Sequence, residues 1–316
     1  MRWLLFFLLI ALLLLTAVGC NAIKLHGQSL ERGFIRQGLD RKLEAVGDAT
    51  VHYYDGGPQE PIGTVLLVHG FGAETVWQWG PQVRALTRAG YRVVVPNLLW
   101  FGQSTSANRD FSIDHQLSTL TALLDHLDLP RVDAVVGISY GGMLAFGLAA
   151  ELPERVGGLV ILDSPGPVYT DADYAGLLAR FSVADPGPLL VPEHHDGIKT
   201  LVDLAYHRPP PTPPWLRKQI LATLYQSDRE EKVELLRDMV ARMDELRSRD
   251  WQVAAPTLLL WGDEDPVFPL EIGHRLSDWM GDGARLVVIE KAKHAPQLEH
   301  PAYVNKLLLG FLAEHR

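Results

Sequence analysis

The sequence has few of the residues that several classes of protein need. It holds one cysteine, Cys20, in 316 residues, which excludes an internal disulfide and any zinc site built on clustered cysteines. Basic residues are in the minority, 29 Lys and Arg against 38 Asp and Glu, and no basic run occurs. A net charge of −9 repels phosphate backbones, so we expect no nucleic-acid partner. No P-loop or G-x-G-x-x-G motif is present, and we expect no nucleotide cofactor and no metal.

The longest hydrophobic run lies at the N-terminus. Arg2 precedes the unbroken apolar stretch Trp3–Leu15, and small residues lead to Cys20. This order of charge, apolar region and small residues predicts a signal peptide over residues 1–19. Its ending resembles the lipobox of bacterial lipoproteins, which implies cleavage after Gly19 and lipidation of Cys20. The prediction is therefore an extracytoplasmic protein held on a membrane by its N-terminus. The alternatives are an uncleaved single anchor or a secreted protein.

From residue 50 onward, short apolar strands alternate with helical segments. The strands are apolar on both faces, which is typical of a sheet covered by helices on both sides. We therefore expect the α/β class, with a doubly wound, mostly parallel sheet. Residues 20–49 are expected to form an N-terminal surface segment, and the core is expected to comprise residues 50–164 and 251–316.

Residues 165–250 interrupt this alternation because they contain no convincing strand. They hold helical runs and a proline-rich stretch, Pro209–Pro214. We interpret them as a helical cap inserted after the sixth core strand. The cap would then cover the carboxyl edge of the sheet, where open α/β sheets bind ligands.

The motif with the clearest chemistry is Gly137-Ile138-Ser139-Tyr140-Gly141. It matches G-x-S-x-G and lies between a predicted strand and a predicted helix, the context of a nucleophile elbow. This context makes Ser139 the candidate nucleophile. The loop His69-Gly70-Phe71-Gly72 follows another strand. In a serine hydrolase such a loop supplies one oxyanion-hole N–H and the residue after the nucleophile supplies the other, here Phe71 and Tyr140.

A serine hydroxyl needs a base, and twelve histidines are available. His294 follows the last predicted strand and so lies at the edge toward which Ser139 points, whereas His69 belongs to the oxyanion loop and is expected to be structural. For the acid that orients the base, Asp265 lies deep in the loop Trp261–Pro269. Asp163, at the end of another strand on the same edge, is a rival. The order Ser139, Asp265, His294 is that of α/β-hydrolases.

These motifs together resemble α/β-hydrolase-fold lipases and esterases, over roughly residues 50–316. The likeness is nearest to bacterial lipases and monoacylglycerol-lipase-like enzymes. It implies a triad of Ser139, Asp265 and His294, with Phe71 and Tyr140 as oxyanion donors. One segment departs from the family pattern D-x-x-G-x-G-x-S, since it begins with Asn97 and has Trp100 in place of the first glycine.

The function we expect is hydrolysis of carboxylic esters of small molecules or lipids through an acyl-enzyme, without a cofactor. Within the same fold the alternatives are a C–C bond hydrolase and an amidase or peptidase, because substrate choice resides in the cap. A non-catalytic lipid-binding lipoprotein is the alternative from another class. A cluster of aromatics could line an acyl pocket or belong to the core; these are Trp77, Trp79, Trp100 and Phe101. The oligomeric state does not follow from the sequence.

Overall fold

The computed structural model describes residues 21–316, and its centre is a nine-stranded sheet of order β1-β2-β4-β3-β6-β7-β8-β9, with β5 paired to β2. The strands from β4 to β9 along this path are parallel, whereas β1, β2 and β5 pair antiparallel at one edge. The predicted α/β, mostly parallel sheet is thus confirmed. The strands are β1 (Leu39–Val46), β2 (Ala49–Gly56), β3 (Gly63–Val68), β4 (Tyr91–Pro96), β5 (Thr105–Ser106), β6 (Ala134–Ile138), β7 (Leu159–Leu162), β8 (Thr257–Gly262) and β9 (Ala284–Ile289).

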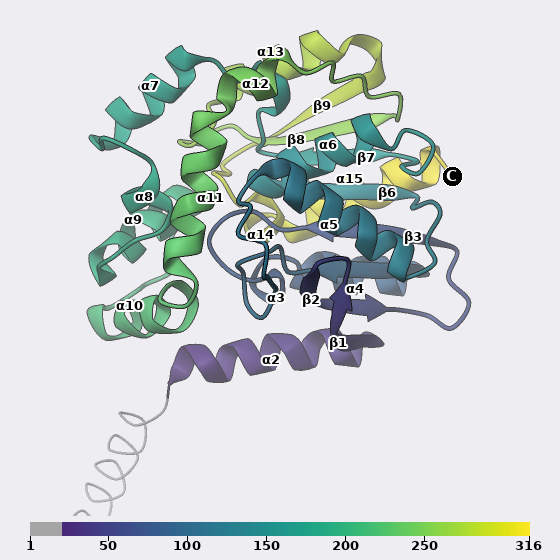
Figure 1. Cartoon of the computed structure of the whole chain (residues 1–316), viewed down its shortest axis with the longest axis horizontal. Coiled ribbons are helices and arrows are strands. Elements are labelled where there is room, and N and C mark those ends of the chain that lie inside the picture. The colour runs from purple at the N-terminus through teal and green to yellow at the C-terminus, as the bar shows by residue number, and fades with distance from the viewer. Residues whose placement is uncertain (1–20) are drawn as a thin grey trace, which may run out of the picture.

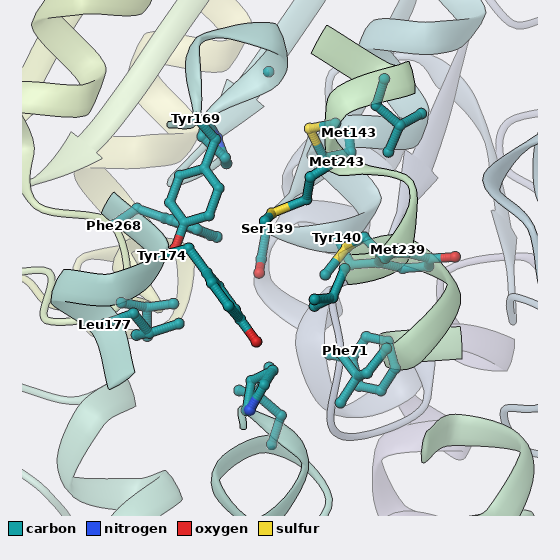
Figure 2. Close-up of a pocket in the computed structure, with 18 of the residues that line it drawn as sticks. Phe71, Ser139, Tyr140, Met143, Tyr169, Tyr174, Leu177, Met239, Met243 and Phe268 are labelled. Carbon is teal, nitrogen blue, oxygen red and sulfur yellow. The ribbon is translucent and has the colours of Figure 1, made fainter. Parts of the chain in front are cut away.

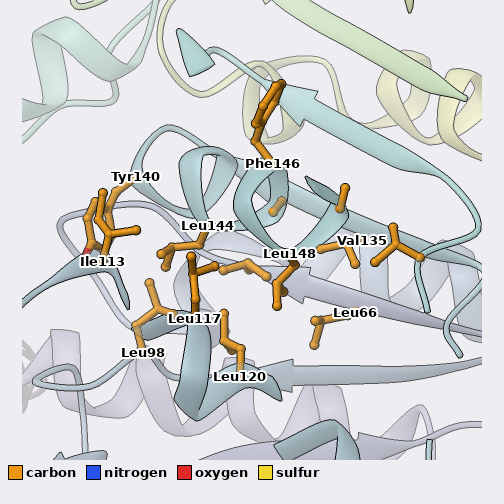
Figure 3. Packing of buried hydrophobic residues seen from close by; sticks show 14 of the residues in the cluster. Leu66, Leu98, Ile113, Leu117, Leu120, Val135, Tyr140, Leu144, Phe146 and Leu148 are labelled. Atoms are coloured by element: carbon orange, nitrogen blue, oxygen red, sulfur yellow. The ribbon is translucent and has the colours of Figure 1, made fainter. Parts of the chain in front are cut away.

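Both faces of the sheet are buried because successive strand residues point to opposite sides. In β3, Val65 and Leu67 join one hydrophobic cluster, whereas Leu66 and Val68 join the other. The cluster with Leu66 packs against α5 and α6 (Figure 3). Helices of this face are α5 (Ile113–His126), α6 (Tyr140–Glu151) and α13 (Leu270–Met280); those contributing to the other cluster are α2 (Ala22–Arg36), α4 (Gly80–Arg88) and α15 (Pro301–Glu314).

The chain between β7 and β8 forms a helical layer beyond one end of the strands (Figure 1). This layer corresponds to the segment interpreted above as a cap. Its residues Leu177, Leu189 and Leu204 form a small hydrophobic cluster with Val267 of the loop after β8. Its elements are η1 (Gly166–Val168), α7 (Asp171–Phe181), α8 (Gly187–Leu190), α9 (His195–Ala205), α10 (Pro214–Ile220), η2 (Leu221–Tyr225), α11 (Arg229–Ala241) and α12 (Met243–Ser248). Three short elements complete the core: α3 (Thr75–Gln78), η3 (Gly281–Gly283) and α14 (Pro296–Glu299).

The segment at the start of the described chain, expected to lie on the surface over residues 20–49, contains regular structure. It contains the helix α2, with Phe34 buried, and the edge strand β1. Helix α2 also contacts the cap, because Asn21 Nδ2 donates to Thr223 Oγ1 (3.0 Å) and the Ala22 N–H donates to Gln219 Oε1 (2.8 Å). Only Ile23 and Phe34 of this mostly polar helix are buried, so its sequence gives little sign of the contacts it makes.

The signal peptide over residues 1–19 and the lipidation site Cys20 lie outside the described residues. They stay predictions, as does the membrane tether. Between residues 21 and 316, no helix combines the length and the apolar character that crossing a membrane requires.

Candidate active site

Ser139 lies between the end of β6 and the start of α6, on a tight turn. Its backbone has φ 53° and ψ −121°, a conformation that costs energy for any residue with a side chain. Strain of this kind is typical of nucleophile elbows, because it raises the hydroxyl above the sheet at a helix N-terminus. Figure 2 shows the Ser139 oxygen pointing into a pocket between Tyr174 and Met239.

Glycines on both sides of Ser139 let the strand and the helix approach closely. A Cβ atom on Gly137 would lie 2.2 Å from the Gly141 carbonyl oxygen. A Cβ atom on Gly141 would lie 2.3 Å from the carbonyl oxygens of Val68 and His69. Both clashes involve backbone atoms, which cannot rotate away, so the elbow motif needs glycine at both positions.

We therefore expect Gly141→Ala to destabilise the fold by about 1–3 kcal/mol or more and to inactivate the site. Thermal unfolding and labelling of Ser139 by a fluorophosphonate probe measure the two effects. Gly310→Ala is the matched control, because a Cβ atom there has no neighbour within 4 Å, and it should stabilise α15 by about 0.5–1 kcal/mol. If Gly141→Ala unfolded at the wild-type temperature and were labelled as fast as the wild type, the close packing around Gly141 would be contradicted.

His294 and Asp265 meet at the carboxyl edge of the sheet, in the loops after β9 and β8. His294 Nδ1 lies 2.8 Å from Asp265 Oδ2, and the Asp265 side chain is fully buried. The other carboxylate oxygen, Oδ1, accepts the N–H groups of Val267 (2.7 Å) and Phe268 (3.2 Å). These bonds fix the carboxylate so that it can hold the imidazole with its proton on Nδ1, which leaves Nε2 free to act as a base.

The rival acid, Asp163, lies beside this pair without the bond to His294. It follows β7, has φ 44°, and is completely buried. Its Oδ1 accepts the Gly262 N–H at 2.8 Å, whereas its buried Oδ2 has no hydrogen-bond partner. Burial, and after it the nearby Asp265 charge, raise the pKa of Asp163 well above its ordinary value. Of the two aspartates, therefore, Asp265 has the geometry of the orienting acid.

The backbone around His294 is held by Glu299 of α14. One carboxylate oxygen of Glu299 accepts the Lys293 N–H at 2.8 Å, and the other accepts the N–H of His207 in the cap at 2.6 Å. In addition, Lys293 Nζ donates to the Asp203 carbonyl oxygen at 2.6 Å. The loop that carries the candidate base is thus tied both to the core and to the C-terminal end of α9.

The oxyanion loop is positioned by His69, which is completely buried. Its Nε2 accepts the Leu98 N–H at 3.0 Å, so the ring proton is on Nδ1 and is donated to the Gly70 carbonyl oxygen at 2.8 Å. Burial lowers the pKa of His69 to about 4, and the ring therefore stays neutral near pH 7. His69 thus has the structural role expected from the sequence.

Both candidate oxyanion donors adjoin Ser139. Tyr140 is the first residue of α6, and N–H groups in a first helical turn have no acceptor within the helix. Phe71 packs edge-on against Tyr140, with ring centroids 5.3 Å apart. Gly70 directly precedes Phe71, and a Cβ atom on it would lie 3.2 Å from Ser139 Cβ. This loop therefore approaches the nucleophile closely.

The segment that departs from the family pattern keeps a tight turn with different residues. Trp100 has φ 72°, a left-handed conformation usually left to glycine, yet its side chain is buried in the core. Asn97 Oδ1 accepts the Thr75 N–H at 2.9 Å, and its Nδ2 lies 2.7 Å from His52 Nδ1. An uncharged amide therefore makes these buried contacts without introducing a buried charge.

The pocket beside Ser139 is built mainly by the cap, and sequence reasoning missed its walls. The suggested aromatics do not line it, since Trp79, Trp100 and Phe101 are buried in the core, and the cap's Trp215 is 57% exposed. Most of the cap residues that do line it have apolar side chains, many of them on helices, a signal that core helices also give. The apolar and aromatic lining includes Phe71, Met143, Tyr169, Tyr174, Leu177, Met239, Met243 and Phe268 (Figure 2).

Comparison with known proteins agrees with this geometry. The pattern of the alpha/beta hydrolase fold family matches residues 63–301. A 2-hydroxy-6-oxononadienedioate/2-hydroxy-6-oxononatrienedioate hydrolase of Paraburkholderia phymatum is 31% identical, covering 86% of this chain and 94% of its own. Lipase 1 of Psychrobacter immobilis is 28% identical, over 92% and 91% of the two chains. The crystal structure of a membrane phospholipase A, a bacterial virulence factor, is 25% identical with a TM-score of 0.73, over 100% and 99%. The chain belongs to the alpha/beta hydrolase fold family, and it is a hydrolase.

Proposed function

We propose that this hydrolase cleaves carboxylic esters with apolar acyl chains, using Ser139, His294 and Asp265 as its triad. The observation that carries the proposal is the apolar pocket into which the Ser139 hydroxyl points. Three of the five methionines line it, Met143, Met239 and Met243. Methionine side chains are flexible and polarisable, so such a wall adapts to acyl chains of different shape.

In the proposed reaction the Ser139 hydroxyl attacks the acyl carbonyl while His294 Nε2 takes its proton. The backbone N–H groups of Phe71 and Tyr140 donate hydrogen bonds to the carbonyl oxygen and so stabilise the negative charge that develops on it. His294 then protonates the departing alcohol, leaving the acyl group on Ser139. Water, deprotonated by the same imidazole, releases the acid and restores the serine. Throughout, Asp265 stabilises the imidazolium across the 2.8 Å bond.

The second candidate is C–C bond hydrolysis, which is favoured by the relatives named as oxononadienedioate hydrolases. A dioate carries two carboxylates, and burying a carboxylate without a charged partner is costly. Among the described residues that line this pocket, Arg247 is the one charged side chain. Its guanidinium already pairs with Asp171 (2.9 Å) and Asp244 and donates to the Tyr169 carbonyl oxygen at 3.2 Å. The pocket therefore suits an apolar acyl group better than a dicarboxylate.

The experiment that separates the two candidates compares kcat/KM for p-nitrophenyl esters of rising chain length with that for a 2-hydroxy-6-oxo-dienedioate. We expect Ser139-dependent hydrolysis of the esters, with a preference for medium or long acyl chains. Efficient cleavage of the dioate with poor ester turnover would instead establish the C–C hydrolase. No Ser139-dependent turnover of either class would refute both candidates and leave the amidase or peptidase and the non-catalytic lipid binder.

The cap should set which acyl length is preferred. Met239→Trp enlarges a side chain in the pocket wall, so it should spare short esters and disfavour long ones. A methylene in an apolar pocket discriminates by about 1–3 kcal/mol, so the ratio of kcat/KM between short and long esters should change by about tenfold or more. Trp215→Ala, in the same cap but exposed, is the control and should leave the ratio unchanged. An equal decrease for all chain lengths in Met239→Trp would mean that the cap serves stability rather than selection.

A further inference from the structure

The acid site holds two buried carboxyl groups, although a triad requires one. Asp163, Asp265 and His294 each place a side-chain oxygen or nitrogen within 4.8 Å of the others. Asp265 is fully engaged by His294 and two backbone N–H groups. Asp163 Oδ2, by contrast, is buried without a hydrogen-bond partner, next to this pair. A buried polar atom without a hydrogen-bond partner calls for an explanation, and this one lies beside the candidate catalytic pair.

Two carboxyl groups this close cannot both be ionised away from water, because like charges repel strongly in a low dielectric. The pair therefore holds one proton near neutral pH. Asp265 makes the three hydrogen bonds that favour a carboxylate, whereas Asp163 accepts one, from Gly262. The proton consequently resides on Asp163. Burial and the Asp265 charge raise the pKa of Asp163 in the same direction.

The other charged group that faces Asp163 strengthens this assignment. The negative charge of Glu299, on α14, raises the pKa of Asp163, as the charge of Asp265 does. The opposing influence is the Gly262 N–H at the end of β8, together with any positive charge that forms on His294 during turnover. Asp163 is therefore neutral in the resting enzyme yet lies close enough to the imidazole to affect it once charged.

We propose that Asp163 is a reserve acid: it stays protonated while Asp265 carries the charge, and it becomes the counter-ion of His294 only when that charge is removed. In an Asp265→Asn protein the Asp163 carboxyl group would release its proton to water. The resulting carboxylate would favour the His294 tautomer with its proton on Nδ1 and would stabilise the imidazolium. The proposal rests on the serine-hydrolase chemistry described above.

The test is a double-mutant cycle with the isosteric variants Asp163→Asn, Asp265→Asn and the two combined. In Asp163→Asn the amide oxygen still accepts the Gly262 N–H and the side chain is still neutral, so kcat should stay within about threefold of the wild type. Asp265→Asn should lose about 10²–10³ in kcat, and the double variant should reach about 10⁴, as when no carboxylate orients a triad imidazole. Asp163→Asn thus costs little alone and much in the Asp265→Asn background.

The pH dependence of kcat distinguishes the proposed role from a role in packing alone, because packing would not depend on the ionisation of Asp163. The comparison at each pH is the ratio of kcat in Asp265→Asn to kcat in the double variant, because these two proteins differ only in whether residue 163 is an acid or an amide. Because Asp163 must be ionised to act, this ratio should be large at high pH and fall toward one as pH drops through the raised pKa of Asp163. A ratio of one at every pH would overturn the proposal. A loss in Asp163→Asn as large as that in Asp265→Asn would also overturn it, by making Asp163 the primary acid.

Two controls separate this proposal from the function on which it rests. Thermal unfolding shows whether each variant folds, and activity is compared only among folded proteins. The rate of Ser139 labelling by a fluorophosphonate probe is compared among the wild type and the three variants. This comparison tests the same cycle without any assumption about the ester. Failure of the wild type to be labelled would refute the serine-hydrolase function itself. Normal wild-type labelling with equal rates in Asp265→Asn and the double variant would refute the reserve acid alone.

Discussion

Ser139→Ala should abolish hydrolysis, lowering kcat by about 10⁶ while leaving the protein folded. The loss is this large because the hydroxyl oxygen forms the acyl-enzyme, and no other group can replace it. The side chain is small and faces the pocket, so its removal disturbs little packing. The measurement is kcat on the preferred ester, together with fluorophosphonate labelling detected by mass spectrometry.

Labelling should disappear in Ser139→Ala and persist in Ser164→Ala. Ser164 is the matched control because it is a buried serine near the same edge of the sheet, after β7, where its hydroxyl adjoins Gly142 rather than the pocket. If a label remained on the Ser139→Ala protein, the nucleophile would have to be another residue. If the folded wild type were never labelled, the elbow would be a structural turn.

His294→Ala should cost almost as much as loss of the nucleophile, again about 10⁶ in kcat. Without the imidazole the hydroxyl proton has no acceptor in the attack, and the departing alcohol has no donor. Triad residues act as a unit, so combining His294→Ala with Ser139→Ala should lower kcat no further. A stopped assay over hours, with an active-site titration of the wild type, covers the required range.

His126→Ala is the control for loss of a histidine as such. His126 lies at the end of α5, half-exposed beside Glu44, and it does not line the pocket. Its replacement should leave kcat unchanged. If His294→Ala retained more than a few per cent of activity, one of the other histidines would be the base. His207, whose Nδ1 lies 2.6 Å from Glu264 in the loop that carries Asp265, would be the first to examine.

The parts of the site that can be predicted are those tied to strand ends. A strand, a two-glycine turn and a helix leave one conformation for Ser139, and a parallel sheet brings the ends of β6, β8 and β9 to one edge. The chain order of serine, acid and histidine then follows. Local sequence was less informative for α2, because its mostly polar residues do not indicate that Phe34 is buried. It was also less informative for the cap, whose apolar residues could equally have belonged to a core.

The sequence by itself determined the fold class and indicated the candidate nucleophile, oxyanion loop and base, because each depends on local geometry and on strand order. The sequence favoured Asp265 over Asp163, but both follow strands at the same edge, and only the tertiary structure shows the contact that separates them, a 2.8 Å bond from Asp265 to His294. The tertiary structure also decided that Trp79, Trp100 and Phe101 belong to the core while cap methionines line the pocket. These outcomes depend on how segments distant in sequence pack together, and no local pattern records the direction in which a side chain on a packed helix finally points.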